Sequence, residues 1–156
     1  MLGYTHYFSG LQATADIIAD ARKIVAASDV TICGPSGEGV PVMTEAEGIR
    51  LNGSRAAGES YETFHVQGTK ELDVPGLGEA CKTDGRPYDE VVTAILIAAA
   101  VRSMESRAGV FTTDGRWDNW SAGVRLYERA VRALTEEEKL ALELDVARMR
   151  PGTLYD

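Results

Sequence analysis

The segment VVTAILIAAAV, residues 91–101, constrains the fold more than any other part of the chain. Its 11 residues carry no charge and are apolar on nearly every face of a helix. A helix at the surface would show a polar stripe, so this one must be covered on most sides by other elements. It is too short for a membrane, because a spanning helix needs about 20 apolar residues. We therefore predict a buried helix around which the rest of the chain packs.

The flanking segments predict both strands and helices. Strand-like runs lie at residues 4–8, 29–33, 48–53, 60–66 and 110–113, and helical patterns lie at 14–28, from 117 onward and from 135 onward. The last helix begins with a capping box of Thr135 and Glu138. This order predicts an α+β fold, with a single mixed sheet of about five strands packed by three or four helices. We place one domain at residues 1–134, with a C-terminal helix and tail at 135–156 appended to it.

Composition narrows the classes of function. The chain has 24 acidic and 16 basic residues, a net charge of −8. A binder of nucleic-acid polymers needs a basic surface to displace counterions, so this class is not expected. A small anionic ligand needs only a few cations or backbone amides and stays compatible. The N-terminus shows no basic region followed by an apolar run, so we expect a cytoplasmic protein of a bacterium or an infected host cell, without membrane contact.

The cysteines and acids suggest neither a disulfide nor a metal site. Cys33 and Cys81 stand alone, without a CxxC or a Cys/His cluster, and are interpreted as reduced, buried thiols. No Asp-x-Asp pattern is present, and nothing in the spacing of the aspartates brings them together. We expect no metal and no cofactor.

The N-terminal segment GYTHYF places three rings and a histidine within six residues. In a strand, Tyr4, His6 and Phe8 would face one side and Thr5 and Tyr7 the other. If the first face is buried, His6 is a structural hydrogen-bonding group. If it opens toward the basic loop that follows Cys81, His6 is a ligand contact or a general base.

The segment GPSGEGVP, residues 34–41, is rich in glycine and follows a strand. Its amides could hold a phosphate, but it matches neither of the common phosphate-loop patterns, and no helix begins directly after it. A glycine turn between strands is the favoured interpretation.

Two segments at helix starts combine cations with rings. CKTDGRPYD contains Lys82, Thr83, Arg86 and Tyr88, and TTDGRWDNW contains Asp114, Arg116, Trp117 and Trp120. Cations beside a helix start bind anions, and a flat ring can stack on a base. The alternative is that the tryptophans are core residues and the cations are only solvated; the sequence leaves both open.

These motifs together resemble a known family. GYTHY, GEGVP (37–41), LNG (51–53), ETF (62–64), CKT…RPYD (81–89) and DG…W from Asp114 occur in the order found in small uncharacterised phage and bacterial proteins with an N-terminal GYTHYW. The similarity spans residues 3–127. This chain differs in having Phe8 instead of tryptophan, Tyr61 where histidine often precedes ETF, a shorter middle section and an added C-terminal helix. The resemblance implies that these segments belong together and suggests a role against host defence.

The leading hypothesis is a non-enzymatic small-molecule binder, a sponge for a nucleotide-derived immune signal. Tyr4 and His6 would line one wall, Asn52 would offer amide hydrogen bonds, and Lys82 and Arg86 would meet an anion. The remaining expected contacts are a stacking ring from Trp117 or Trp120 and polar groups of Thr83, Tyr88, Asp114 and Arg116.

Two alternatives stay open. One is a hydrolase of a phosphorylated or glycosylated small molecule, with His6 or Asp114 as base and Lys82 as charge stabiliser. The other is an inhibitor of a host protein that uses its acidic final helix, with Glu136, Glu137, Glu138, Glu143 and Asp145, as contact or as the seam of a homodimer.

Overall fold

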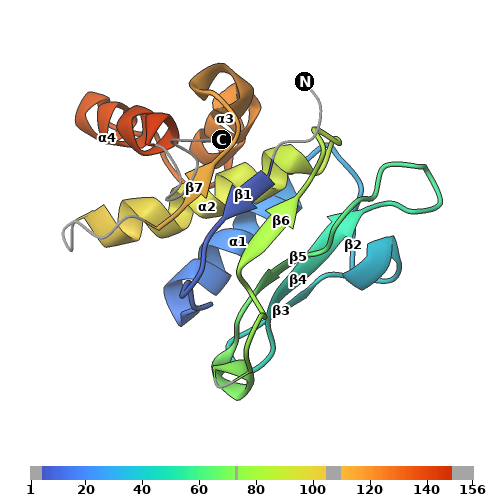
Figure 1. Ribbon diagram of the computed structural model, residues 1–156. Coiled ribbons are helices and arrows are strands. Elements are labelled where there is room, and N and C mark those ends of the chain that lie inside the picture. Colours follow the sequence, from blue (N-terminus) through green and yellow to red (C-terminus); the bar gives the residue numbers. More distant parts are fainter. Residues whose placement is uncertain (1–4, 73, 105–109, 149–156) are drawn as a thin grey trace, which may run out of the picture.

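The computed structural model describes residues 5–72, 74–104 and 110–148, and these form a mixed α and β structure (Figure 1). The α+β class predicted from sequence is confirmed. The α-helices are α1 (Ala15–Ala27), α2 (Asp89–Ser103), α3 (Ser121–Ala130) and α4 (Glu136–Ala147). The strands are β1 (Thr5–Tyr7), β2 (Ile32–Cys33), β3 (Val42–Thr44), β4 (Gly48–Gly53), β5 (Phe64–Val66), β6 (Ala80–Lys82) and β7 (Thr112–Thr113). Short 3-10 turns are η1 (Pro35–Gly37), η2 (Thr69–Glu71) and η4 (Trp117–Trp120).

Helix α2 is the centre of the core, as its apolar sequence predicts. Every side chain from Val91 to Ala99 has an exposed fraction of 0%. Helices α1 and α3 pack on it and on each other, and α1 also contacts strand β3. Gly123 of α3 sits so close that a Cβ atom there would lie 2.0 Å from the Thr93 hydroxyl oxygen. This close approach explains why α3 carries a glycine as its third residue.

The strands form two sheets, so the prediction of a single sheet is wrong. One sheet has the order β6-β1-β7, and the other contains β2, β3 and β5 around β4. In the first sheet, His6 lies opposite Cys81 and Thr113 and is buried, whereas Thr5 and Tyr7 point outward. A backbone hydrogen bond from Glu62 to Lys82 joins the two sheets without extending a ladder. Strand β6 has three residues and follows an irregular segment, and the sequence did not indicate it.

The glycine segment 34–41, which contains η1, leaves the second sheet between β2 and β3. These strands pair with adjoining stretches of β4: Cys33 lies opposite Asn52, and Val42 lies opposite Arg50. The Gly34 amide donates to two carbonyls across the neck of the segment, at 3.0 and 3.2 Å. The segment is therefore a closed loop between two strands, as the favoured interpretation held, and we call it the glycine loop.

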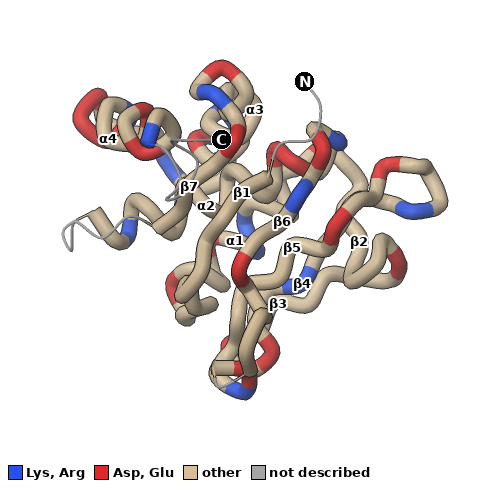
Figure 2. Tube along the Cα trace, in the orientation of Figure 1, with Lys and Arg blue, Asp and Glu red and all other residues tan. Residues whose placement is uncertain are grey.

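Helix α4 packs onto the rest of the chain through Leu142 and Val146, which belong to the main hydrophobic core. Its capping box is confirmed, since the Thr135 hydroxyl accepts from the Glu138 amide and the Glu138 carboxylate accepts from the Thr135 amide. Acidic positions are spread over both helices and loops (Figure 2). Across the described ranges, no helix combines the length and apolar character needed to cross a bilayer.

Candidate functional site

Four buried polar side chains tie the first sheet to the start of α2. Nε2 of His6 lies 2.7 Å from Asp89 Oδ1, and Nδ1 lies 2.8 Å from the Thr113 hydroxyl oxygen. The Thr83 hydroxyl donates to the same Asp89 oxygen at 2.6 Å. Both ring nitrogens of His6 therefore have hydrogen-bond partners. The network links β1, β7, α2 and the residue after β6, so the GYTHY, CKT and RPYD motifs converge on one structural task.

The same network resembles a hydroxyl–imidazole–carboxylate triad, but it is closed to substrate. His6 and Thr83 have exposed fractions of 0%, Asp89 of 6% and Thr113 of 8%. The Thr113 hydroxyl also accepts the Gly115 amide at 3.0 Å, so it is held in a turn. A catalytic nucleophile and base must reach the reacting atoms, and these do not. Of the two interpretations of His6 given above, its burial therefore supports the structural hydrogen-bonding group.

Asn52 holds the ends of the loop that follows β4. Its Nδ2 donates to the Tyr61 carbonyl at 3.0 Å and to the Thr63 hydroxyl at 3.2 Å. Its Oδ1 accepts from the amides of Gly53 and Tyr61, at 2.8 and 3.0 Å. The side chain is fully buried, and both ends of the amide are used in these bonds. Asn52 thus closes residues 53–61 into a loop and is not presented to a ligand.

Tyr88 holds the far end of the same loop. Its buried hydroxyl donates to the Glu62 carbonyl at 2.5 Å, and the Cys81 thiol donates to that carbonyl at 3.4 Å. Burial raises the pKa of the Cys81 thiol and of the Tyr88 hydroxyl far above their usual ranges. Both groups therefore stay protonated and act as donors.

Lys82 and Arg86 meet over one exposed ring, that of Tyr61. The Lys82 ammonium lies 5.8 Å and the Arg86 guanidinium 5.5 Å from the ring centroid, which is within range for cation–π attraction. Arg86 also donates to the Gly58 carbonyl at 2.9 Å, so it supports the 53–61 loop from outside. The structure brings these two predicted anion contacts together, on the outer side of the loop.

The second predicted cluster does not join the first. Trp120 is fully buried and stacks on Phe111, with ring centroids 4.6 Å apart, and Trp117 packs partly buried against the core. Asp114 is exposed and accepts from the Tyr7 hydroxyl at 3.4 Å, whereas Arg116 is exposed at the start of η4. Tyr4, the remaining predicted contact, lies outside the described residues.

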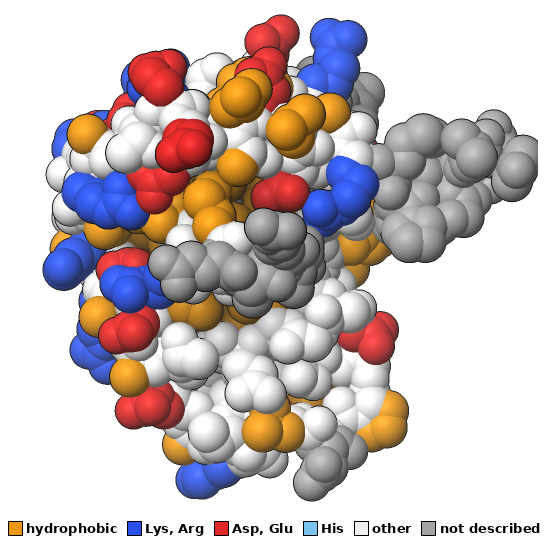
Figure 3. Space-filling view, turned by 90° about the vertical axis from the view of Figure 1, so that its left-hand side faces the viewer, with side chains coloured by type: hydrophobic (Ala, Val, Ile, Leu, Met, Phe, Trp, Pro, Cys, Tyr) orange, Lys and Arg blue, Asp and Glu red, His pale blue; other side chains and the backbone are white. Residues whose placement is uncertain are grey.

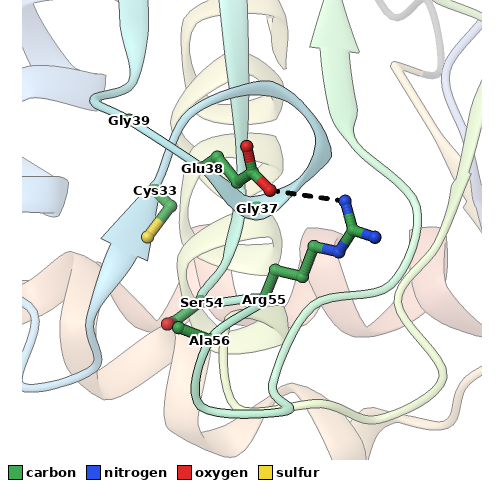
Figure 4. A pocket seen from close by; sticks show the side chains of 7 residues that line it. All are labelled: Cys33, Gly37, Glu38, Gly39, Ser54, Arg55 and Ala56. Atoms are coloured by element: carbon green, nitrogen blue, oxygen red, sulfur yellow. Dashed lines mark hydrogen bonds and ion pairs between the residues drawn. The ribbon is translucent and has the colours of Figure 1, made fainter.

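A pocket opens between the glycine loop and the turn that follows β4 (Figure 4). Its volume is about 600 Å³, within the range of small-molecule sites. We call it the glycine-loop pocket, and its lining is Cys33, Gly37, Glu38, Gly39, Ser54, Arg55 and Ala56. None of these residues was among the expected contacts. The glycine loop was the available signal; Arg55, in an irregular link, offered none.

The backbone around the pocket is fixed from both sides. The Arg55 amide donates to the Gly37 carbonyl at 3.0 Å, and the Ser36 amide donates to the Thr63 hydroxyl at 2.9 Å. Gly37 has φ +85°, and a Cβ atom there would lie 2.9 Å from both the Arg55 Cβ and the Gly53 carbonyl oxygen. Only glycine fits this position without displacing the turn. The pocket is therefore preformed.

The described residues contain no group of three or more His, Cys, Asp or Glu side chains arranged to hold a metal ion. Comparisons with protein-family models, with curated proteins and with solved structures find no match. The glycine-loop pocket and the groups that hold it are therefore the candidate site.

Proposed function

We propose that this protein binds a small anionic ligand, of nucleotide-like chemistry, in the glycine-loop pocket. The observation that carries the proposal is a preformed pocket of about 600 Å³ with the Arg55 guanidinium in its lining. Arginine pairs with carboxylates and phosphates through two parallel hydrogen bonds, which gives both strength and orientation. The net charge of −8 does not oppose this, because one local cation and nearby amides suffice for a small anion.

The rest of the lining suits recognition by hydrogen bonds. Ser54 contributes a hydroxyl and Cys33 a thiol, and three lining residues are glycine or alanine, which let a ligand approach the backbone. Arg55 lies on a turn closed by a bond from the Glu59 amide to the Ser54 carbonyl, at 2.8 Å. A ligand would therefore meet a backbone that is already in place, which lowers the entropy cost of binding.

Binding without turnover is the form of the proposal that the geometry favours. A hydrolase built on His6 would need an accessible imidazole, and this one is enclosed with both ring nitrogens bonded. Asp114, the other suggested base, lies on β7's side of the first sheet, whereas the pocket borders the second. We propose sequestration of a nucleotide-derived immune signal as the biological role, in keeping with the resemblance to phage proteins.

Calorimetry of the full chain with AMP, ADP-ribose and cyclic di-AMP tests the proposal. We expect at least one probe to bind at micromolar concentration and to be recovered intact after the protein is denatured. Arg55→Met should abolish that binding, while Arg116→Met, a matched loss of an exposed arginine elsewhere, should leave it unchanged. Recovery of a cleaved probe would contradict sequestration, and binding that survives Arg55→Met would contradict the assigned site.

A second candidate, the inhibitor of a host protein, is favoured by one observation on α4. Leu140 and Leu144 lie one turn apart and are 59% and 65% exposed. On this side of the molecule, hydrophobic side chains lie among acidic and basic ones (Figure 3). Deleting the helix would remove core residues, so the double variant L140E/L144E is the cleaner test. It should abolish capture of a host protein if this candidate holds, with the wild-type chain and an Ala147→Glu variant as controls.

A further inference from the structure

The glycine-loop pocket already contains an anion. One Glu38 carboxylate oxygen lies 3.3 Å from Nη1 of Arg55, and the two side chains meet across the pocket (Figure 4). Their side chains are 70% and 67% exposed. The ion pair is therefore solvated and has a single contact within hydrogen-bond distance.

The backbones of the two residues are held independently of this pair. The Glu38 carbonyl accepts from the Gly34 amide at 3.0 Å, and the Arg55 amide donates to Gly37 at 3.0 Å. Breaking the side-chain contact would therefore leave the loop and the turn in place. Glu38 can swing away without unfolding the site, because its exposed side chain has no other hydrogen bond or ion pair among the described residues.

We infer that Glu38 is a built-in competitor for Arg55, which a ligand displaces with its own anionic group. This inference rests on the proposed function and adds a selection rule to it. A phosphate monoester or carboxylate offers two oxygens to the guanidinium and replaces one weak contact by a bidentate pair. A neutral ligand of the same shape cannot displace Glu38. The pocket therefore favours ligands with a terminal phosphate or carboxylate that can accept two hydrogen bonds from the guanidinium.

The size of the effect follows from the exposure of the pair. An exposed ion pair is worth a factor of about 1.4 to 5 in an equilibrium constant. Removing the Glu38 charge should tighten anion binding by that factor. It should not change the fold, because the side chain is exposed and its backbone bonds remain.

The test compares AMP with adenosine in the wild-type chain, Glu38→Gln, Arg55→Met and Glu47→Gln. Glu47→Gln removes the same charge from the turn between β3 and β4 and controls for net charge. We expect Glu38→Gln to bind AMP about 1.4 to 5 times more tightly. Its affinity for adenosine, and the affinity of Glu47→Gln for AMP, should stay at the wild-type values.

Three outcomes overturn the inference in distinguishable ways. If AMP binds the wild-type chain and is lost in Arg55→Met, but Glu38→Gln binds it no more tightly, Glu38 is not a competitor and the proposed function stands. If Glu47→Gln tightens AMP binding as much as Glu38→Gln, the effect is general electrostatics. If AMP binds none of these proteins, the inference fails, and the proposed function fails with it only if ADP-ribose and cyclic di-AMP also do not bind.

Discussion

The variant Asn52→Ala tests whether Asn52 stabilises the loop that follows β4 or contacts a ligand. The substitution removes four hydrogen bonds, two donated to Tyr61 and Thr63 and two accepted from Gly53 and Tyr61. At about 0.5–1.5 kcal/mol each, their loss would lower the free energy of unfolding by about 2–6 kcal/mol. Water can reach part of the opened loop and rehydrate its backbone. We therefore expect the free energy of unfolding to fall by about 3 kcal/mol, in the lower half of that range. That corresponds to a fall in Tm of about 6–12 °C for a chain of this size.

Urea denaturation and amide hydrogen exchange measure this prediction together. The free energy of unfolding should fall by the stated amount, and the Tyr61 amide should lose its protection. Asn52→Asp is a second variant: it keeps the oxygen that accepts from Gly53 and Tyr61 but buries a carboxylate whose other oxygen faces the Tyr61 carbonyl, so it should cost at least as much as Asn52→Ala. A fall below about 1 kcal/mol in Asn52→Ala, with loss of ligand binding at full stability, would refute the reasoning and return Asn52 to the list of ligand contacts.

Gly37→Ala should destabilise the fold and abolish binding, since its Cβ would lie 2.8 Å from the Ser60 Cβ. Gly39→Ala is the control: Gly39 has φ +68° and nothing within 4 Å of an added Cβ, so only the backbone cost of about 1 kcal/mol is expected. Denaturation curves measure the stability of both variants. Burial opposes ionisation of Glu71, but hydrogen bonds and charges from the Gly68 amide, His65 and Arg50 outweigh it and lower the pKa of this carboxyl. The ionised Glu71 therefore stabilises the fold at neutral pH, and this stabilisation is lost as the pH falls through the lowered pKa. Glu71→Gln should lower the free energy of unfolding at neutral pH and make it depend less on acid pH. Arg102→Met should cost about 3–5 kcal/mol, because it leaves the buried Asp20 carboxylate without its 2.7 Å partner, and the Asp20→Asn/Arg102→Met pair should recover much of the loss in thermal melts.

The local patterns of the sequence predicted the elements that need no distant partner. The unbroken apolar run of α2 requires burial whatever surrounds it, and the capping box of Thr135 and Glu138 is complete within four residues. Alternation in GYTHYF likewise placed His6 and Thr5 on opposite faces, as the structure has them.

The features that the sequence did not predict are set by contacts between distant segments. Strand β6 is three residues long and is held by pairing with β1, more than 70 residues earlier in the chain, so no local period marks it. The division into two sheets depends on that pairing. Asn52 and Tyr88 were predicted as ligand contacts because polar and aromatic groups serve both roles, and only the fold shows that they hold the 53–61 loop.

Arg55 is a pocket residue that the sequence did not predict. It lies in a link without a motif, and it gains a role only because the glycine loop, about 20 residues earlier, returns beside it. The glycine loop itself was recognisable as a turn, but its use as one wall of a pocket requires the opposite wall.

An NMR titration of the isotopically labelled full chain with AMP and ADP-ribose tests the glycine-loop pocket most directly. We expect saturable shifts of the backbone amides of Cys33, Gly37, Gly39 and Ala56, which line the pocket. The amides of His6 and Trp120, enclosed in the core, should not move. Saturable shifts confined to the surroundings of Lys82 and Trp117, or no saturable shift with either probe, would contradict the assigned site.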